Sequence, residues 1–209
     1  LDPRPPLISV LGHTALLQRD MVAIVGARNA SALGRKFAFT LAQELGAASL
    51  VIASGLARGI DSAAHEGALK TGTVAVLAGG VDVVYPPEKQ KLYDAICAEG
   101  AILSKMRFGE APQARHFPRR NRLISGLARG LVVVEAAERS GSLITANYAL
   151  DQGREIFAVP GSPLDPRAKG PNRLIRDGAT LTENAEDVLA VLRPILMLVL
   201  AVLPLVPAT

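Results

Sequence analysis

The sequence is poor in cysteine, histidine and aromatic residues, and each shortage excludes a class of protein. A single cysteine, Cys97, cannot build an intramolecular disulfide framework, which indicates a protein of a reducing compartment. Three histidines and one cysteine show no recognisable metal-ligand spacing, so we expect neither a metal nor another cofactor. Aromatic residues make up 4% of the 209 residues and tryptophan is absent, which disfavours a long base-stacking platform.

Signals for membrane insertion and export are missing as well. The apolar stretch 195–203 is too short to span a bilayer, and Pro194, Pro204 and Pro207 bracket it. The sequence starts with a proline-rich segment, where a signal peptide would have a basic and then an apolar region. We therefore expect a cytoplasmic protein with no membrane partner, in which residues 193–209 form an apolar tail or linker.

Positive charge is concentrated in one part of the chain. The net charge is only +4, yet residues 105–129 hold seven Lys or Arg against one acid, Glu110. At their centre, residues 117–122 read FPRRNR. Because guanidinium groups bind phosphate oxygens in a forked geometry, this cluster indicates a polyanionic partner. Two alternatives stay open: a solvated basic face, or an arginine that pairs with Glu135 or another carboxylate inside the fold.

Apolar runs typical of strands alternate with helical patterns along most of the chain. We expect strands at residues 21–26, 50–53, 73–77, 101–103, 131–134 and 156–159. We expect helices at residues 31–46, 60–69, 88–98, 143–151, 172–176 and 185–192. Uninterrupted Val, Ile, Leu and Ala runs are typical of strands buried on both faces. The pattern predicts an α/β domain over residues 21–192, with a doubly wound, mostly parallel sheet and helices on both faces. Residues 1–20 would form an N-terminal extension with a short strand at 7–11.

Turns rich in glycine and serine follow several of these strands, and in a parallel sheet such turns share one edge. Arg28 follows the first strand, before a helix that Ser31 caps, where backbone amides favour an anion. Residues 54–59, SGLARG, follow the second strand; their glycines allow close backbone approach and Ser54 adds a hydroxyl donor. Ser140-Gly141-Ser142 and Thr145 follow the fifth strand. Glycine after one strand marks only a turn, but together these turns predict a site for a phosphate-bearing ligand.

Asp61 and His65 are four residues apart and therefore lie on one face of a helix. In an enzyme, His65 would be a general base oriented by Asp61. The structural alternative is an aspartate favoured by the helix dipole and a histidine that hydrogen-bonds a neighbouring loop. We favour the structural interpretation and expect no catalytic residues.

Six motifs in chain order resemble the DprA/Smf family of DNA-processing proteins, over about residues 7–190. These motifs are IVGAR at 24–28, SGLARGID at 54–61 with Ala64-His65, Tyr85-Pro86, FPRRNR at 117–122, SGSLIT at 140–145 and VPG at 159–161. The resemblance implies an extended Rossmann-like domain that binds single-stranded DNA, protects incoming DNA, forms a homodimer and helps to load the RecA recombinase in natural transformation. Family members often carry a helical domain before this core and a winged-helix-like domain after it, so the chain resembles the central domain.

The resemblance and the turn chemistry together give a set of expected DNA-binding residues. They are Arg28, Ser54, Gly55, Gly59, Phe117, Arg119, Arg120, Asn121, Arg122, Ser140, Gly141, Ser142 and Thr145. Arginines would neutralise phosphates while backbone amides position the strand, and Phe117 would either stack on a base or belong to the core. The family usually has Glu after the serine of the fourth strand, whereas here Lys105 follows Ser104. Any role that the family's glutamate has at that position is therefore not expected of this chain.

The competing functional class is a nucleotide-binding enzyme. Lysine-decarboxylase-like nucleoside-phosphate hydrolases bind a nucleotide at the same sheet edge and typically carry a Pro-Gly-Gly-x-Gly-Thr block followed by Glu. Residues 140–145, SGSLIT, lack that glycine pattern, which favours a binding protein. A third interpretation, a scaffold for recombinase and dimer contacts, stays open.

Overall fold

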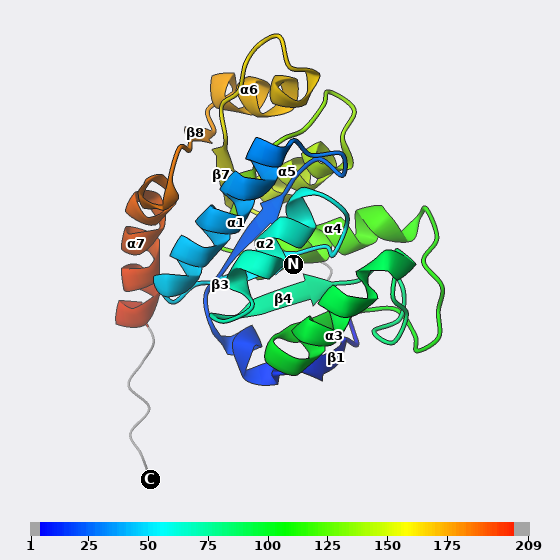
Figure 1. Cartoon of the computed structure of the whole chain (residues 1–209). Helices are drawn as coiled ribbons and strands as arrows, with labels where there is room; N and C mark the ends of the chain where they lie inside the picture. The colour runs from blue at the N-terminus through cyan, green and yellow to red at the C-terminus, as the bar shows by residue number, and fades with distance from the viewer. Residues whose placement is uncertain (1–4, 203–209) are drawn as a thin grey trace.

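The structure is a computed structural model that describes residues 5–202 and has three layers, with one eight-stranded sheet between two layers of helices (Figure 1). The elements in chain order are β1 (Ser9–Gly12), η1 (Thr14–Gln18), β2 (Met21–Val25), α1 (Ala32–Ala47), β3 (Val51–Ser54), α2 (Ile60–Ala68), β4 (Thr73–Val76), η2 (Pro87–Lys89), α3 (Gln90–Glu99), β5 (Ala101–Ser104), α4 (His116–Leu127), β6 (Gly130–Val133), α5 (Gly141–Asp151), β7 (Glu155–Ala158), η3 (Pro166–Ala168), α6 (Lys169–Arg176), β8 (Thr180–Leu181) and α7 (Ala185–Val202).

The strand order places one crevice at the centre of the sheet. The order is β1-β5-β4-β3-β2-β6-β7-β8, and every pairing is parallel except that of β1 with β5. The expected α/β fold with a mostly parallel sheet is therefore confirmed. From β2 the chain winds outward to β5 and then returns to β6, on the other side of β2. Ligands of doubly wound sheets bind at such a reversal, outside the carboxyl ends of the strands.

Both faces of the sheet are buried under helices, as the uninterrupted apolar strands predict. Val22 and Ile24 of β2 pack in a cluster with residues of α1, α2 and α7. Met21 and Ala23 point to the opposite face, where they join residues of α4 and α5. Figure 1 shows α1 and α2 in front of the sheet, with α4 and α5 behind it. The helices cover the two faces of the sheet but leave the edge at the carboxyl ends of its strands accessible.

Helix α4 is the main element that the sequence did not predict, and it contains the whole basic cluster. Most of its first seven residues are polar, so the sequence shows no clear apolar periodicity there. Leu123 and Ile124 nevertheless form a short apolar face that is buried against the sheet. Pro118 is the third residue of the helix, where its missing N–H has no intrahelical partner to lose. The arginines therefore lie on a rigid helix at fixed angles to one another.

Two stretches at the ends of the chain differ in extent from the sequence prediction. Ser9–Gly12 of the expected N-terminal extension pairs with β5 and joins the sheet. The last helix was expected to end at residue 192, but α7 continues through Pro194 to Val202. The remainder of the expected tail, residues 203–209, lies outside the described residues. In the described part of the chain, no helix combines the length and the apolar character needed to cross a bilayer.

Candidate ligand groove at the strand ends

Two adjoining cavities at the carboxyl edge of the sheet form a groove. The smaller has a volume of about 390 Å³ and the larger about 670 Å³. Both lie within the roughly 300–1,000 Å³ that is typical of small-molecule sites. The residues that line both cavities are Arg28, Asn29, Ala57, Phe117 and Arg120. Because these five residues are shared, one extended ligand could occupy both cavities at once.

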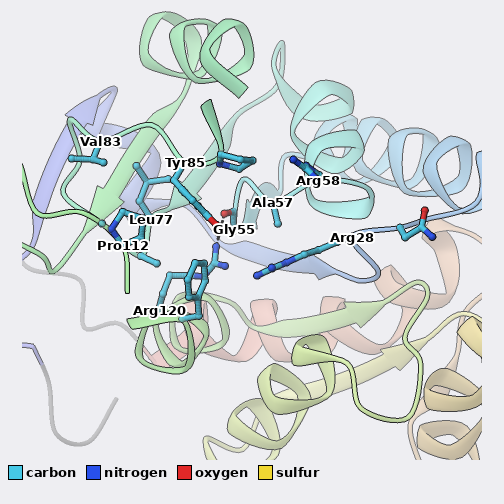
Figure 2. Close-up of a pocket in the computed structure, with 14 residues that line it drawn as sticks. Arg28, Gly55, Ala57, Arg58, Leu77, Val83, Tyr85, Pro112 and Arg120 are labelled. Atoms are coloured by element: carbon cyan, nitrogen blue, oxygen red, sulfur yellow. Dashed lines mark hydrogen bonds between the residues drawn. The ribbon is translucent and has the colours of Figure 1, made fainter. Parts of the chain in front are cut away.

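The smaller cavity has one apolar side and one cationic side. It lies beyond β3 and β4, and Figure 2 shows Leu77, Val83 and Pro112 on one side and Arg28 and Arg58 on the other. The Arg58 guanidinium forms an ion pair with Glu88, so its positive charge is partly neutralised. Arg28 forms no ion pair among residues 5–202. The cavity therefore suits a flat, largely apolar group that carries an anion on one side.

The larger cavity lies where the strand order reverses, between the turns that follow β2 and β6. The first turn of α5 forms one wall, and the Ser140 side chain caps that helix by accepting from the Ser142 N–H. Asn121 of α4 donates through its side-chain amide to the Gly141 carbonyl oxygen at 3.3 Å. The positive end of the helix dipole and the guanidinium of Arg139 both favour an anion in this cavity.

Phe117 lies at the junction of the two cavities. Its ring centroid is 5.4 Å from Cζ of Arg28 and 5.7 Å from Cζ of Arg120. The Tyr85 ring lies 6.0 Å away at 60° to it, from the loop after β4. Phe117 is half-buried and lines both cavities, so part of its ring is accessible to a ligand in the groove. The groove therefore places a cation and an aromatic ring side by side at its centre.

Arg120 is buried beneath the groove and holds the ends of two strands together. Its Nη1 donates to the carbonyl oxygens of Gly55 and Val76, the latter at 3.1 Å, while its Nε has no partner among the described atoms. Burial lowers the pKa of Arg120, and the nearby Asp61 opposes that effect. Burial raises the pKa of Asp61, while Arg120 and the Gly55 and Ala57 amides act in the other direction. Arg120 is thus a buried cation whose charge acts on the buried carboxyl group of Asp61, without a direct ion pair between the two in residues 5–202.

Glycines allow the turns after β2 and β3 to approach each other and Arg120. A Cβ on Gly55 would lie 2.6 Å from Cζ of Arg120 and 2.8 Å from Oδ2 of Asp61. Gly59 has a φ of 76°, which favours glycine, and a Cβ there would lie 2.7 Å from the Arg28 carbonyl oxygen. The Ile60 amide then donates to the Ala27 carbonyl oxygen at 3.2 Å. Any side chain at either position would therefore clash, and glycine lets the two turns come this close.

His65 lies in the core and away from the groove. Nδ1 is 2.7 Å from the Thr73 hydroxyl, which itself donates to the Ile52 carbonyl oxygen, so Nδ1 carries the proton. The buried Nε2 has no partner among the described atoms. Burial lowers the pKa of His65 to about 3, with the charge of Arg120 adding to the effect. In residues 5–202, no three His, Cys, Asp or Glu side chains are grouped as metal ligands.

The expected DNA-binding residues separate into three groups. Arg28, Gly55, Phe117, Arg120, Asn121, Ser140, Gly141, Ser142 and Thr145 line the groove. Ser54 and Gly59 lie beneath it: the Ser54 hydroxyl is buried and donates to the Ile24 carbonyl oxygen at 2.6 Å, so it does not face a ligand. Arg119 and Arg122 line neither cavity, because their helical positions turn them to another side of α4.

Several groove residues were missed in the sequence because they come from loops. Tyr85, Arg139 and Arg167 line the cavities without standing directly at a strand end. Arg139 directly precedes Ser140, whose turn was expected at this edge, so its place in the groove could have been predicted from the sequence. Arg167 forms a two-pronged pair with Asp165, at 2.8 Å for Nη2, and no local pattern placed it near the groove. Glu135 was considered as a partner for an arginine of the basic cluster. It instead accepts hydrogen bonds from the amide and hydroxyl of Ser31.

Comparison with known proteins identifies relatives over nearly the whole chain. The model of the family described as DNA recombination-mediator protein A matches residues 1–193. The DNA processing protein DprA of Streptococcus pneumoniae is 47% identical over 188 residues, and that of Bacillus subtilis is 45% identical over 190. These matches cover 89% and 90% of this chain, but only 66% and 64% of the two relatives. The chain thus spans less than two thirds of their length.

A solved structure shares the fold over most of both chains. It is the DNA processing protein A of Helicobacter pylori, described by its single-stranded DNA binding mode. It superposes with a TM-score of 0.86 at 30% identity and covers 93% of this chain and 90% of the other.

Proposed function

Because this chain belongs to the DNA recombination-mediator protein A family, which includes the DprA/Smf proteins, we propose that it binds single-stranded DNA in the groove without making or breaking bonds. The observation that carries this proposal is the pairing of Arg28 with Phe117 where the two cavities meet. A nucleotide has a flat base with aromatic faces and an anionic phosphate, and this junction offers a partner to each. The description of the Helicobacter pylori relative by a single-stranded DNA binding mode supports the same ligand.

The groove chemistry assigns parts of a strand to parts of the site. A base enters the smaller cavity, between its apolar side and the Phe117 ring, while phosphates lie against Arg28 and the first turn of α5. Stacking on an aromatic ring is tolerant of sequence because every base has a π-face. We therefore propose little sequence preference and a marked preference for unpaired bases.

The wider role that we propose follows the family. The chain would protect incoming DNA in the cytoplasm and help to load the RecA recombinase during natural transformation and recombination. It would act as a homodimer, with RecA and the single strand as its partners. These partners are proposed from family membership, since the groove accounts only for the DNA.

Single-stranded DNA is expected to bind the chain much more tightly than duplex DNA of equal length. Paired and stacked bases cannot enter a cavity of about 390 Å³, so a duplex can offer only its phosphates. Fluorescence anisotropy with labelled oligonucleotides of several sequences, single-stranded and annealed, measures the difference. Each titration is run at two salt concentrations, because affinity from phosphate contacts falls steeply with salt. Equal affinity for both forms would contradict the groove and leave only a generic basic surface.

The nucleotide-hydrolase alternative predicts turnover that the geometry of His65 does not support. With a pKa lowered to about 3 and a buried Nε2, this histidine is a poor general base and does not line the groove. We expect the purified protein to release neither base nor phosphate from nucleoside monophosphates, as measured by chromatography over hours. Turnover that disappears in a folded Arg28→Gln variant would locate an active site in the groove and overturn the binding-only proposal. Turnover that survives in Arg28→Gln would still count against it if it disappears in a folded His65→Asn variant.

A further inference from the structure

Helix α4 presents a second cationic surface, outside the groove. Phe117, Arg120 and Asn121 line the groove, whereas Arg119 and Arg122, three residues apart, share another side of the helix. Arg119 is exposed and Arg122 is partly exposed. The basic cluster is thus divided by the helix between two surfaces.

Lys105 brings a third cation to Arg119 and Arg122. It is exposed and directly follows β5, so it lies at the same edge of the sheet as the groove. Desolvation lowers the pKa of Lys105, and the charges of Arg119 and Arg122 lower it further. We call these three residues the α4 patch.

The α4 patch adjoins the smaller cavity. The Ser104 hydroxyl, next to Lys105, donates to the carbonyl oxygen of Gly79, a lining residue, at 2.6 Å. The same hydroxyl accepts from the Met106 amide at 3.0 Å, which fixes the backbone on both sides of Lys105. The groove and the α4 patch therefore follow one another along the same sheet edge, first past β3 and β4 and then past β5.

Two members of the α4 patch, Lys105 and Arg119, are not neutralised by nearby carboxylates. Glu110 lies 3.6 Å from the buried His116 ring, and Asp82 accepts from the Gly109 amide at 2.9 Å. Within residues 5–202, neither Lys105 nor Arg119 forms an ion pair. Three cations held together cost stability, and an anion placed among them would relieve that repulsion.

We propose that Lys105, Arg119 and Arg122 form a second phosphate-binding surface, which holds the sugar-phosphate backbone of the strand after it leaves the smaller cavity. The inference rests on the proposed function, because the strand in the groove is the polyanion delivered to this place. The surface offers no cavity and no aromatic ring among its three members, so it contacts phosphates and not bases. It therefore adds affinity and salt dependence only for strands long enough to reach it.

A length series of oligonucleotides separates the two surfaces. We expect Arg119→Gln to leave binding of the shortest oligonucleotide unchanged, in a series of roughly 4 to 16 nucleotides, the range of site sizes known for small single-strand-binding folds. On the longest oligonucleotide, the slope of log affinity against log salt should fall by about 0.7, the value for one phosphate contact on a single strand. Lys105→Glu should weaken the binding of long oligonucleotides more than Arg119→Gln does, because it adds a negative charge that repels phosphates.

The matched control is Lys36→Glu, the same change of charge at an exposed lysine of α1, across the sheet from α4. It should match the wild type at every length. Lys105→Glu should also raise the melting temperature at low salt, since it replaces a cation that Arg119 repels by an anion that Arg119 attracts. If Lys105→Glu and Arg119→Gln bind every length as Lys36→Glu does, the second surface is refuted and the patch is left to an acidic partner. If both weaken the shortest oligonucleotide as much as the longest, the patch belongs to the groove. In either case, loss of short-oligonucleotide binding in Arg28→Gln would still support the groove.

Discussion

Replacement of Arg120 by methionine is expected to lower the free energy of unfolding by about 3–5 kcal/mol at neutral pH, the usual cost of leaving a buried charge, here Asp61, without the opposite charge that compensates it. Arg120 and Asp61 are each only 6% exposed. After the replacement, Asp61 keeps the Gly55 and Ala57 amides but loses its neighbouring cation. The carbonyl oxygens of Gly55 and Val76 also lose their donor. Urea unfolding followed by circular dichroism measures the loss.

The loss is expected to grow as the pH rises. Burial raises the pKa of Asp61 above its ordinary value of 3.8 in the folded protein, and Arg120 is the largest influence that opposes this rise. A folded protein with a raised pKa binds more protons than the unfolded chain, so the contribution of Asp61 to stability is greatest below pH 3.8 and is lost as the pH rises through its folded pKa. Removal of Arg120 raises that pKa further and deepens the loss toward neutral pH. Wild type and variant should therefore differ less in mild acid than at neutral pH.

Two further variants test whether the influence of Arg120 on Asp61 causes the effect. Addition of Asp61→Asn to Arg120→Met should recover much of the stability, because an apolar or neutral replacement of both partners is often tolerated. Arg119→Met, one position earlier and exposed, should change the free energy of unfolding by only about 0.5 kcal/mol or less. An equal loss in Arg119→Met and Arg120→Met would show that the basic cluster acts as a whole and not through Asp61.

The sheet could be predicted from the sequence because each of its central strands has a recognisable local pattern. Each central strand is an uninterrupted apolar run between a helix and a glycine-rich turn, and Ser31 marks the start of α1 through a cap that the structure confirms. Helix α4 could not be predicted in the same way, because six polar or proline residues precede its buried Leu123 and Ile124. Local patterns reveal an element when most of its residues obey them.

The candidate site was predictable only as far as strand ends determine it. Arg28 and the first turn of α5 were expected at the groove because parallel strands bring such turns to one edge. The contact of Arg120 with the Gly55 carbonyl oxygen joins residues 65 positions apart and depends on how α4 crosses the strand ends. Ser54 shows the opposite error: its hydroxyl is near the edge but points to Ile24, where a buried donor needs an acceptor. Which way a side chain points is set by packing, not by its place in a motif.

Replacement of Phe117 by alanine is expected to weaken single-stranded DNA binding by about 1–3 kcal/mol, the value for loss of one base–aromatic stack. The salt dependence should not change, because a stacked base releases no counterion. Arg28→Gln should do the reverse and lower the slope of log affinity against log salt by about 0.7. Anisotropy titrations of both variants over a salt series separate the two contributions, although Cζ of Arg28 lies only 5.4 Å from the Phe117 ring centroid.

The interpretation depends on whether the Phe117 ring binds DNA or only supports Arg28. If the ring merely holds the guanidinium in place, Phe117→Ala should flatten the salt slope as Arg28→Gln does, and the double variant should lose no more than either single one. If the ring stacks on a base, the two losses should add and only Arg28→Gln should alter the slope. Phe117→Leu keeps an apolar side chain in the half-buried position but removes the π-face, so it should bind as weakly as Phe117→Ala while unfolding like the wild type. Wild-type affinity in Phe117→Leu would show that packing alone is needed at the junction, and the base would then have to be held by the neighbouring ring of Tyr85, which also lines the smaller cavity.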